Sequence, residues 1–304
     1  MTRCLVIGGN GFIGSHVVDE LRMLGHDVAV YDRFSSGATR YTATDVTAHI
    51  GDFLDVETLS KVIPGYEVIY HLATSTTPAT ATTDPLLDMR TNVIGSVEML
   101  RVAAVAGVSH VYFGSSGGTI YGSLEDHAAR EDDPTVPISP YGIGKLAVER
   151  YLDYFFTTTG MNWTSFRIAN AYGPRQSQTR QQGVIPIFLR RVLLGEPLQV
   201  LGDGSMARDY IYVSDVARQI VGTLGRASAH HVYNVGSGVA TTVNEVLQAI
   251  SDVTGREYAT VSTQTPPTFV HRAVLDTSRY RAEFGETNPM SLHQGIERTW
   301  NALT

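Results

Sequence analysis

A tyrosine and a lysine stand four residues apart in the segment Ser-Pro-Tyr-Gly-Ile-Gly-Lys at 139–145. Residues at this spacing share one face of a helix, and Pro140 favours a helix start just before Tyr141. A free phenol has a pKa of about 10, and a cation held ~4 Å away at an effective dielectric near 20 would lower that pKa by roughly three. Tyr141 would then be a general base and Lys145 its electrostatic partner. Because such pairs also arise by chance, the assignment depends on the other motifs.

A glycine-rich turn, Gly8-Gly9-Asn10-Gly11-Phe12-Ile13-Gly14, directly follows the apolar run Arg3–Ile7. Glycines allow a tight strand-to-helix turn and the close approach of a pyrophosphate to the positive end of the helix dipole. Asp32 lies eighteen residues after Gly14, where a carboxylate can accept hydrogen bonds from ribose hydroxyls. Its charge would repel a 2′-phosphate, so NAD is predicted over NADP, although the neighbouring Arg33 is a residue type that accommodates that phosphate.

The scaffold for these residues is predicted to be α/β, because short apolar runs alternate with helical patterns from residue 3 to about 168. The predicted strands are Arg3–Ile7, Asp27–Tyr31, Ala48–Gly51, Val68–Leu72, Val111–Gly114 and Trp163–Ile168. One apolar helix face is predicted from Leu86, Met89, Val93, Val97, Leu100 and Ala104, and a further helix over 141–158. We therefore expect a Rossmann-type, doubly wound parallel sheet.

A smaller C-terminal lobe is expected, because the pattern becomes irregular after residue 170, with helical stretches near 184–194, 214–225 and 242–254. Residues 1–168 would be the NAD-binding domain and residues 169–304 mainly a substrate-binding lobe, with some segments returning to the sheet. The threonine-rich segment 74–83 is predicted to be a loop after the fourth strand, either a plain surface loop or a ligand-binding one.

Composition excludes several classes of function. The 304 residues include 23 Lys and Arg against 30 Asp and Glu, a net charge of −7 with no basic run, so nucleic-acid binding is disfavoured. No apolar stretch approaches the roughly 18 residues that span a bilayer, and the N-terminus shows no export signal, so a cytoplasmic protein without membrane contact is expected. The sequence has one cysteine, Cys4, in an apolar run. A single cysteine excludes an all-cysteine metal site, and no metal is predicted.

Together these motifs resemble the extended short-chain dehydrogenase/reductase family, and within it the sugar-nucleotide epimerases and dehydratases. The matching residues begin with Gly8-x-x-Gly11-x-x-Gly14, Asp32, Asp52, His71-Leu72-Ala73, Asn92, Ser115-Ser116 and Tyr141-x-x-x-Lys145. The resemblance continues through Arg167–Pro174, Gly202-Asp203-Gly204 with Arg208-Asp209-Tyr210, Tyr233-Asn234-Val235-Gly236 and Ser291-Leu292-x-x-Gly295-Ile296. It therefore covers nearly the whole chain.

The resemblance implies a role for each matching residue. NAD would be held by Gly8, Gly11, Phe12, Ile13, Gly14, Asp32, Arg33, Asp52, Phe53, Leu72, Ala73, Asn92 and Ser115, with Lys145 on the nicotinamide ribose. The nucleotide sugar would be held by Thr74, Asn170, Arg208 and Arg272. Tyr141 would be the catalytic base, helped by Lys145 and the positive nicotinamide. His71, at a strand end, is expected to be a hydrogen-bonded structural histidine.

The reaction is predicted from the segment Ser115-Ser116-Gly117-Gly118-Thr119-Ile120-Tyr121-Gly122. Dehydratases and decarboxylases of the family carry an acidic residue just after the Ser or Thr of this strand, and none is present here. We therefore expect an NAD-dependent 4-epimerase of a nucleotide hexose, UDP-linked, that forms a 4-keto intermediate and takes the hydride back on the other face. A dehydratase, a keto-sugar reductase or a non-catalytic cofactor-binding protein remain alternatives.

Two positions depart from the family pattern. Gly117 stands where epimerases carry a Ser or Thr that binds the reacting hydroxyl, so this role would pass to Ser116 or Thr119. An Arg-x-Gly-Asp motif of the family is replaced by Pro266-Pro267-Thr268-Phe269. Arg272 would supply part of the diphosphate binding that this motif provides. The resemblance also suggests a homodimer formed through a four-helix bundle of the helices near 86–106 and 141–158.

Overall fold

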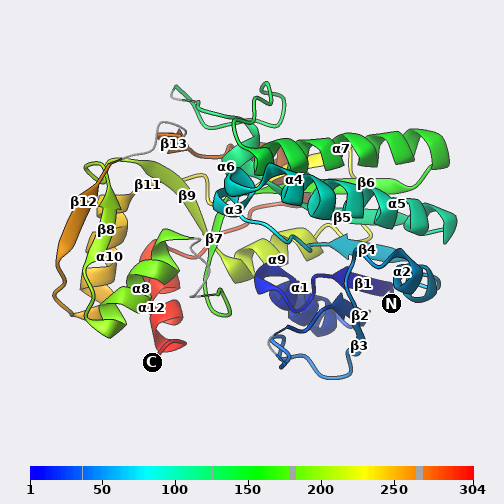
Figure 1. The fold of residues 1–304 in the computed structure, drawn as a ribbon, viewed down its shortest axis with the longest axis horizontal. Coiled ribbons are helices and arrows are strands. Elements are labelled where there is room, and N and C mark those ends of the chain that lie inside the picture. Colours follow the sequence, from blue (N-terminus) through cyan, green and yellow to red (C-terminus); the bar gives the residue numbers. More distant parts are fainter. Residues whose placement is uncertain (36, 125, 178–182, 265–269) are drawn as a thin grey trace.

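A seven-stranded parallel sheet forms the centre of the protein in the computed structural model, which describes residues 1–304 except 36, 125, 178–182 and 265–269 (Figure 1). The strand order is β10-β6-β5-β4-β1-β2-β3. The bounds are β1 Arg3–Ile7, β2 Asp27–Asp32, β3 Thr47–Ile50, β4 Val68–His71, β5 His110–Ser116, β6 Asn162–Ile168 and β10 Val232–Val235. All six predicted strands are confirmed to within two residues. The winding reverses between β1 and β4, which in such sheets marks the ligand-binding crevice.

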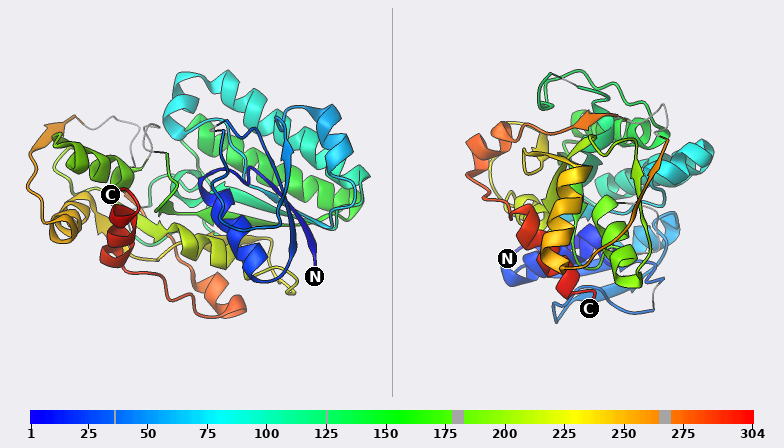
Figure 2. Two further views of the ribbon diagram at one scale, coloured as in Figure 1. Left: turned by 90° about the horizontal axis from the view of Figure 1, so that it is seen from below. Right: turned by 90° about the vertical axis from the view of Figure 1, so that its left-hand side faces the viewer.

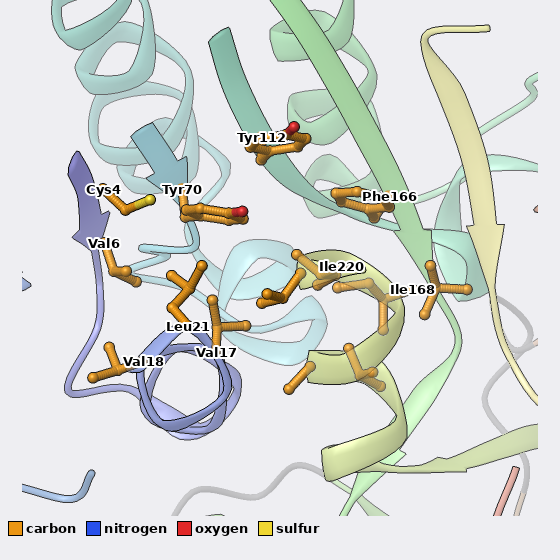
Figure 3. Close-up of a cluster of buried hydrophobic side chains, with 14 of the residues drawn as sticks. Cys4, Val6, Val17, Val18, Leu21, Tyr70, Tyr112, Phe166, Ile168 and Ile220 are labelled. Carbon is orange, nitrogen blue, oxygen red and sulfur yellow. The ribbon is translucent and has the colours of Figure 1, made fainter. Parts of the chain in front are cut away.

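Helices cover both faces of this sheet because its buried strands point alternate apolar side chains in opposite directions. Cys4 and Val6 face α1 (Phe12–Met23) and α9 (Val213–Val221), as Figure 3 shows for the surrounding cluster of buried side chains. Leu5 and Ile7 face the opposite layer. That layer consists of α2 (Val56–Val62), α5 (Gly95–Val105) and α7 (Pro140–Thr159). The fold is therefore the predicted doubly wound α/β sheet.

A second, smaller body lies at one end of the sheet (Figure 2). Its strands are β7 Asn170–Tyr172, β8 Leu198–Leu201, β9 Ala207–Tyr212, β11 Ala240–Thr242, β12 Thr260–Thr263 and β13 Arg272–Ala273. Its helices are α8 Val184–Leu194, α10 Val243–Thr254 and α12 Leu292–Asn301, which share one apolar core. Two later segments, α9 and β10, instead pack with the large sheet, as does α11 (Ser278–Phe284) through Tyr280.

Two local predictions are wrong. The expected single helix with an apolar face from Leu86 to Ala104 is divided into α4 (Pro85–Asp88), a π-helical turn at Met89–Ile94, and α5. A π turn holds more residues than an α turn, so the face changes register, and Leu86 and Met89 are 61% and 55% exposed. The segment expected to be a loop contains α3 (Pro78–Thr83), begun by a Thr77 cap and by proline at the first helical position.

Within the described ranges, no helix has both the length and the apolar character to cross a bilayer. The same residues contain no group of three or more His, Cys, Asp or Glu side chains placed to hold a metal ion.

Candidate active site

The glycine-rich turn packs directly against the segment that follows β4. A Cβ at Gly8 would lie 2.6 Å from the amide nitrogen of Ala73, and one at Gly14 would lie 2.1 Å from the carbonyl oxygen of Gly8. Gly8 also has a φ of +83°, which side-chain-bearing residues rarely adopt. The turn therefore needs glycine at both places, and it lies at the winding reversal with the start of α1 (Phe12 and Ile13) beside it. This geometry fits the predicted pyrophosphate site.

Asp32, the last residue of β2, joins the two loops around the predicted ribose site. Its carboxylate accepts hydrogen bonds from the backbone of Asn10 at 3.0 Å and of Phe34 at 3.1 Å. A carboxylate offers about four acceptor positions, so two remain for ribose hydroxyls. Arg33 pairs with Asp52 at 3.7 Å. The paired Arg33 guanidinium is then less available to bind a 2′-phosphate. The arrangement fits an unphosphorylated ribose, as predicted.

Asn10 is a buried polar residue of the glycine-rich turn that the sequence motifs did not single out. It is 5% exposed, its amide donates to Ala38 O at 2.9 Å, and its amide oxygen accepts from the backbone of Arg40 at 2.7 Å. Asn10 thus holds the loop after β2 against the glycine turn. A polar amide in an otherwise apolar glycine motif was the available signal.

Phe53 and His71 belong to the core beside the cofactor crevice. The Phe53 side chain is 7% exposed and lies with its ring centre 5.8 Å from that of His71, so any contact with adenine would involve its backbone. His71 Nε2 lies 2.7 Å from Ser96 Oγ, and burial, with the field of Lys145, lowers the pKa of His71 to about 3. His71 is therefore a neutral, hydrogen-bonded structural histidine, as expected.

Tyr141 and Lys145 occupy one face of α7, which begins with a Ser139 cap and Pro140. Lys145 Nζ lies 5.6 Å from the Tyr141 ring centre and 4.7 Å from that of Phe113, and it donates to Gly114 O at 2.7 Å. Burial lowers the pKa of Lys145 to about 8. The predicted pair is therefore present, in a setting largely shielded from water.

Burial is the largest influence on the pKa of Tyr141 when no cofactor is bound. Burial, with a smaller effect from the charge of Asp88, raises the pKa of Tyr141 to about 12, against a hydrogen bond with Thr74 that lowers it. Among the described residues, Lys145 is not one of the groups that shift this pKa, so the expected lowering toward neutrality, which also relied on the positive nicotinamide, stays a prediction. Oxidised nicotinamide, when bound, supplies a further positive charge, which acts in the predicted direction.

Among the described residues, unpartnered buried polar atoms occur at the end of β5, just after it, and at one paired position of β7 and β9. They are Ser115 Oγ, Thr119 Oγ1, Asn170 Nδ2 and Tyr210 OH, all buried and all without a hydrogen bond. Buried polar atoms are nearly always bonded, so these atoms fit a site that a polar ligand completes.

The short helix α6 (Gly117–Ile120) ties these atoms to Tyr141. A Cβ at Gly142 would lie 2.5 Å from Thr119 O, so α6 rests on the first turn of α7. A Cβ at Gly118 would lie 4.0 Å from Asn170 Nδ2. Asn170 Nδ2 thus lies beside α6, the helix that carries Thr119, and the Ser116 side chain makes no cap hydrogen bond to this helix.

The two predicted diphosphate arginines are engaged with backbone carbonyls. Arg208 donates to Ala207 O at 2.8 Å, to His271 O at 3.1 Å and to Val270 O at 2.6 Å. Arg272 donates to His127 O at 2.8 Å. Since a guanidinium has five N–H donors, two of those of Arg208 remain for a ligand. The Pro266–Phe269 departure lies outside the described residues.

Asn92 turns inward and holds the turn after β4. Its amide donates to Thr76 Oγ1 at 2.6 Å and to Asp88 Oδ1 at 2.8 Å, and its oxygen accepts from the backbone of Ser75 at 2.9 Å. Its polar atoms are therefore committed to the protein, and its contribution to a cofactor site is to shape the 74–76 turn.

A dinucleotide turn at the winding reversal, together with a Tyr–Lys pair whose lysine is buried, defines an enzyme that carries out nicotinamide-dependent chemistry on a hydroxyl group. The model of the NAD dependent epimerase/dehydratase family matches residues 4–236, and the chain belongs to that family. This confirms the resemblance, the enzyme class and the NAD dependence predicted from the sequence.

Similar proteins cover the whole chain. A UDP-glucose 4-epimerase of Mycolicibacterium smegmatis is 35% identical over 98% of this chain and 97% of its own. The crystal structure of a UDP-glucose 4-epimerase from Thermotoga maritima with UDP-glucose has a TM-score of 0.93 and 35% identity, over 99% of this chain and 98% of that one. A UDP-glucose 4-epimerase of Thermus thermophilus in complex with NAD has a TM-score of 0.92 and 34% identity, with the same coverage.

Proposed function

We propose that this protein is an NAD-dependent 4-epimerase of a nucleotide hexose, with the UDP-glucose/UDP-galactose pair as substrates. One observation carries the proposal: the Tyr141–Lys145 pair lies beside α6, where Thr119 has an unpartnered buried hydroxyl, and the segment 115–122 has no carboxylate. The three similar proteins described above, all UDP-glucose 4-epimerases, support the same reaction.

In this proposal Tyr141 takes the proton of the C4 hydroxyl and later returns it, while Thr119 or Ser116 holds that hydroxyl by a hydrogen bond. Bound NAD would supply the hydride chemistry at C4. Lys145, held by Gly114 O, orients the nicotinamide ribose and offsets phenolate charge. The sugar ring must present its other face between the two transfers, so the net reaction inverts C4 and consumes no cofactor.

The remaining contacts of the proposal follow the crevice. NAD would be held by Gly8, Gly11, Phe12, Ile13, Gly14, Asp32, Arg33, Asp52, Phe53, Leu72, Ala73 and Ser115, and Asn92 would contribute by shaping the 74–76 turn. The nucleotide sugar would be held by Thr74, Asn170, Arg208 and Arg272. Residues 1–168 would form the NAD-binding domain, and 169–304 mainly the substrate lobe.

An elimination reaction is less well supported. A 4,6-dehydratase must move a proton from C5 and expel the C6 hydroxyl, which calls for an acid–base pair near the reacting carbons. Residues 115–122 offer only hydroxyl groups. A keto-sugar reductase would differ again, because it would change the amount of NADH during turnover.

A homodimer in the cytoplasm, where NAD and nucleotide sugars are found, belongs to the same proposal. Exposed apolar side chains lie along α4, the π turn and α7, and they include Leu86, Met89, Ile94, Ile143 and Tyr154, each more than half exposed. Figure 1 shows α5 and α7 side by side at the edge of the molecule. Sedimentation at micromolar concentration should show a dimer, and a monomer alone would contradict this part. Fractionation of cells should place the protein with the cytoplasm.

Proton NMR of the purified protein with NAD in deuterated water tests the reaction. UDP-glucose, UDP-N-acetylglucosamine and UDP-glucuronate are incubated separately. A galacto-configured product without ring deuterium would establish 4-epimerisation by internal hydride return. A 4-keto-6-deoxy product, or deuterium at C5, would show elimination and refute the proposal, as would the absence of any product.

A further inference from the structure

Asp88, the last residue of α4, places a buried carboxylate against the face of α7 that carries Tyr141 and Lys145. It is 2% exposed. A Cβ on Gly144 would lie 2.7 Å from Asp88 Oδ2. Gly144 is next to Lys145 and three residues from Tyr141, so this carboxylate oxygen lies beside the pair. Gly144 leaves the room that the carboxylate needs.

The other oxygen of Asp88 organises the turn after β4. Asp88 Oδ1 accepts from Asn92 Nδ2 at 2.8 Å and from the Thr76 hydroxyl through a short hydrogen bond. This fixes the orientation of the Asn92 amide, whose oxygen accepts from the Ser75 backbone at 2.9 Å and lies 3.5 Å from Thr74 Oγ1. Thr74 in turn is hydrogen-bonded to Tyr141. A continuous chain of contacts thus joins Asp88 to the catalytic phenol.

Three titratable groups besides the pair itself act on the Tyr141–Lys145 site. Glu149, from α7, is paired with Arg167 at 2.8 Å, and both side chains are buried. His71, from β4, is neutral because burial lowers its pKa to about 3. Asp88, from α4, is the third, and its charge raises the pKa of Tyr141 and of Lys145. Among these groups Asp88 is the one whose negative charge no arginine offsets within the described residues.

We propose that Asp88 is a positioning residue of this active site: it fixes the Asn92 amide and the Thr74–Thr76 turn beside Tyr141, and its charge holds Lys145 in the cationic form. This inference rests on the proposed function for the assignment of Tyr141 as the base. Nothing in the chain's resemblance to the family had assigned Asp88. The sequence feature that could have indicated this role is the Asp88 carboxylate, which lies in a helix expected to present an apolar face.

The test compares Asp88→Asn with Asp84→Asn, which removes the exposed carboxylate that caps the start of the same helix and leaves an asparagine, also a good capping residue. In NAD-loaded protein, the tyrosinate absorbance of each variant is titrated with pH, and the signal of its Tyr141→Phe double variant is subtracted. Asp88→Asn should move the Tyr141 midpoint to lower pH, on the order of one pH unit, because a nearby negative charge disfavours the phenolate. Asp84→Asn should leave it in place. An unmoved midpoint in Asp88→Asn would overturn the electrostatic role.

Turnover supplies the second readout. Asp88→Asn should lower kcat by roughly tenfold to a hundredfold with KM little changed, because Thr74 and Tyr141 lose their alignment. The acidic limb of its pH–rate profile should move to lower pH. Thr76→Val keeps the charge but removes one donor to Asp88, so it should lower kcat without moving the Tyr141 midpoint to lower pH. Wild-type kcat in both variants would refute the positioning role.

The two proposals fail in different ways. If none of the UDP-sugars is epimerised, the proposed function fails, yet the Tyr141 midpoint still reports the effect of Asp88. If Asp88→Asn loses NAD or unfolds, Thr76→Val decides the positioning role by kcat. Bound NAD and thermal unfolding are therefore measured for every variant.

Discussion

Leu275 lies directly over Gly117, although 158 residues separate them in the chain. A Cβ on Gly117 would come within 2.5 Å of Leu275 Cδ1 and 3.0 Å of Arg167 O. This contact explains the departure from the family pattern at position 117. A serine or threonine there would require the Leu275 side chain to shift, which favours a neighbouring residue as the source of a hydroxyl for the substrate.

Gly117→Ser should therefore destabilise the protein by about 1–3 kcal/mol, the usual cost of overpacking a filled core. Adding Leu275→Ala should recover part of that loss by making room for the new side chain. Gly118→Ser is the matched control, since the nearest atom to its Cβ is 4.0 Å away. Thermal or urea unfolding measures all of them. Equal stability of the two serine variants would refute the steric explanation.

Thr119→Val should lower kcat roughly tenfold, because it removes one hydrogen bond to the reacting hydroxyl. The free energy of unfolding should stay the same. Stability is expected to hold because Thr119 Oγ1 makes no hydrogen bond within the protein. Thr119→Ser keeps the hydroxyl and should stay active. If Thr119→Val turns over normally, the role belongs to Ser116.

Tyr141→Phe should reduce kcat by at least 10²–10⁴-fold, the usual contribution of a general base, and leave NAD bound. The phenylalanine keeps the aromatic ring and its packing, so the unfolding temperature should change little. Epimerisation is followed by NMR and NAD by its absorbance after denaturation. Full retained activity would disprove the assignment of Tyr141 as the base.

Lys145→Met should abolish turnover but raise stability at neutral pH, because it removes a buried charge. Burial lowers the pKa of Lys145 from 10.5 to about 8, so between these values the unfolded chain binds more protons than the folded one. The free energy of unfolding of the wild type should therefore rise with pH across this range, relative to Lys145→Met. Urea unfolding from pH 7 to 10 measures the difference. A gap that widens above pH 8 would contradict this sign.

Asp52→Asn should increase the affinity for NADP by several fold. A half-exposed ion pair contributes about 1 kcal/mol, and this free energy corresponds to such a change in affinity. The change frees Arg33, now 3.7 Å from Asp52, to meet a 2′-phosphate. The affinity for NAD should change less, since Asp32 is untouched. Calorimetry with both nucleotides gives the ratio. An unaltered ratio would show that Arg33 does not face the ribose.

The sequence by itself determined the sheet, the dinucleotide turn and the spacing of the catalytic pair. These features follow from short-range geometry. Apolar runs such as Cys4–Ile7 must be strands covered on both faces, and the glycines from Gly8 to Gly14 permit one kind of turn. Tyr141 and Lys145 share a face because a helix returns to it after four residues. The resemblance to the family added the reaction, and family membership confirmed its class.

Only the tertiary structure decided how these residues behave. The π turn at Met89–Ile94 shifts the register of a helix face that the sequence pattern predicted to be continuous. Asp88, just before this turn, packs against Gly144. Burial is the largest influence on the pKa of Tyr141. Leu275 closes the space beside Gly117. Desolvation and steric exclusion depend on which distant segments pack against a residue, and local patterns in a sequence do not record those neighbours.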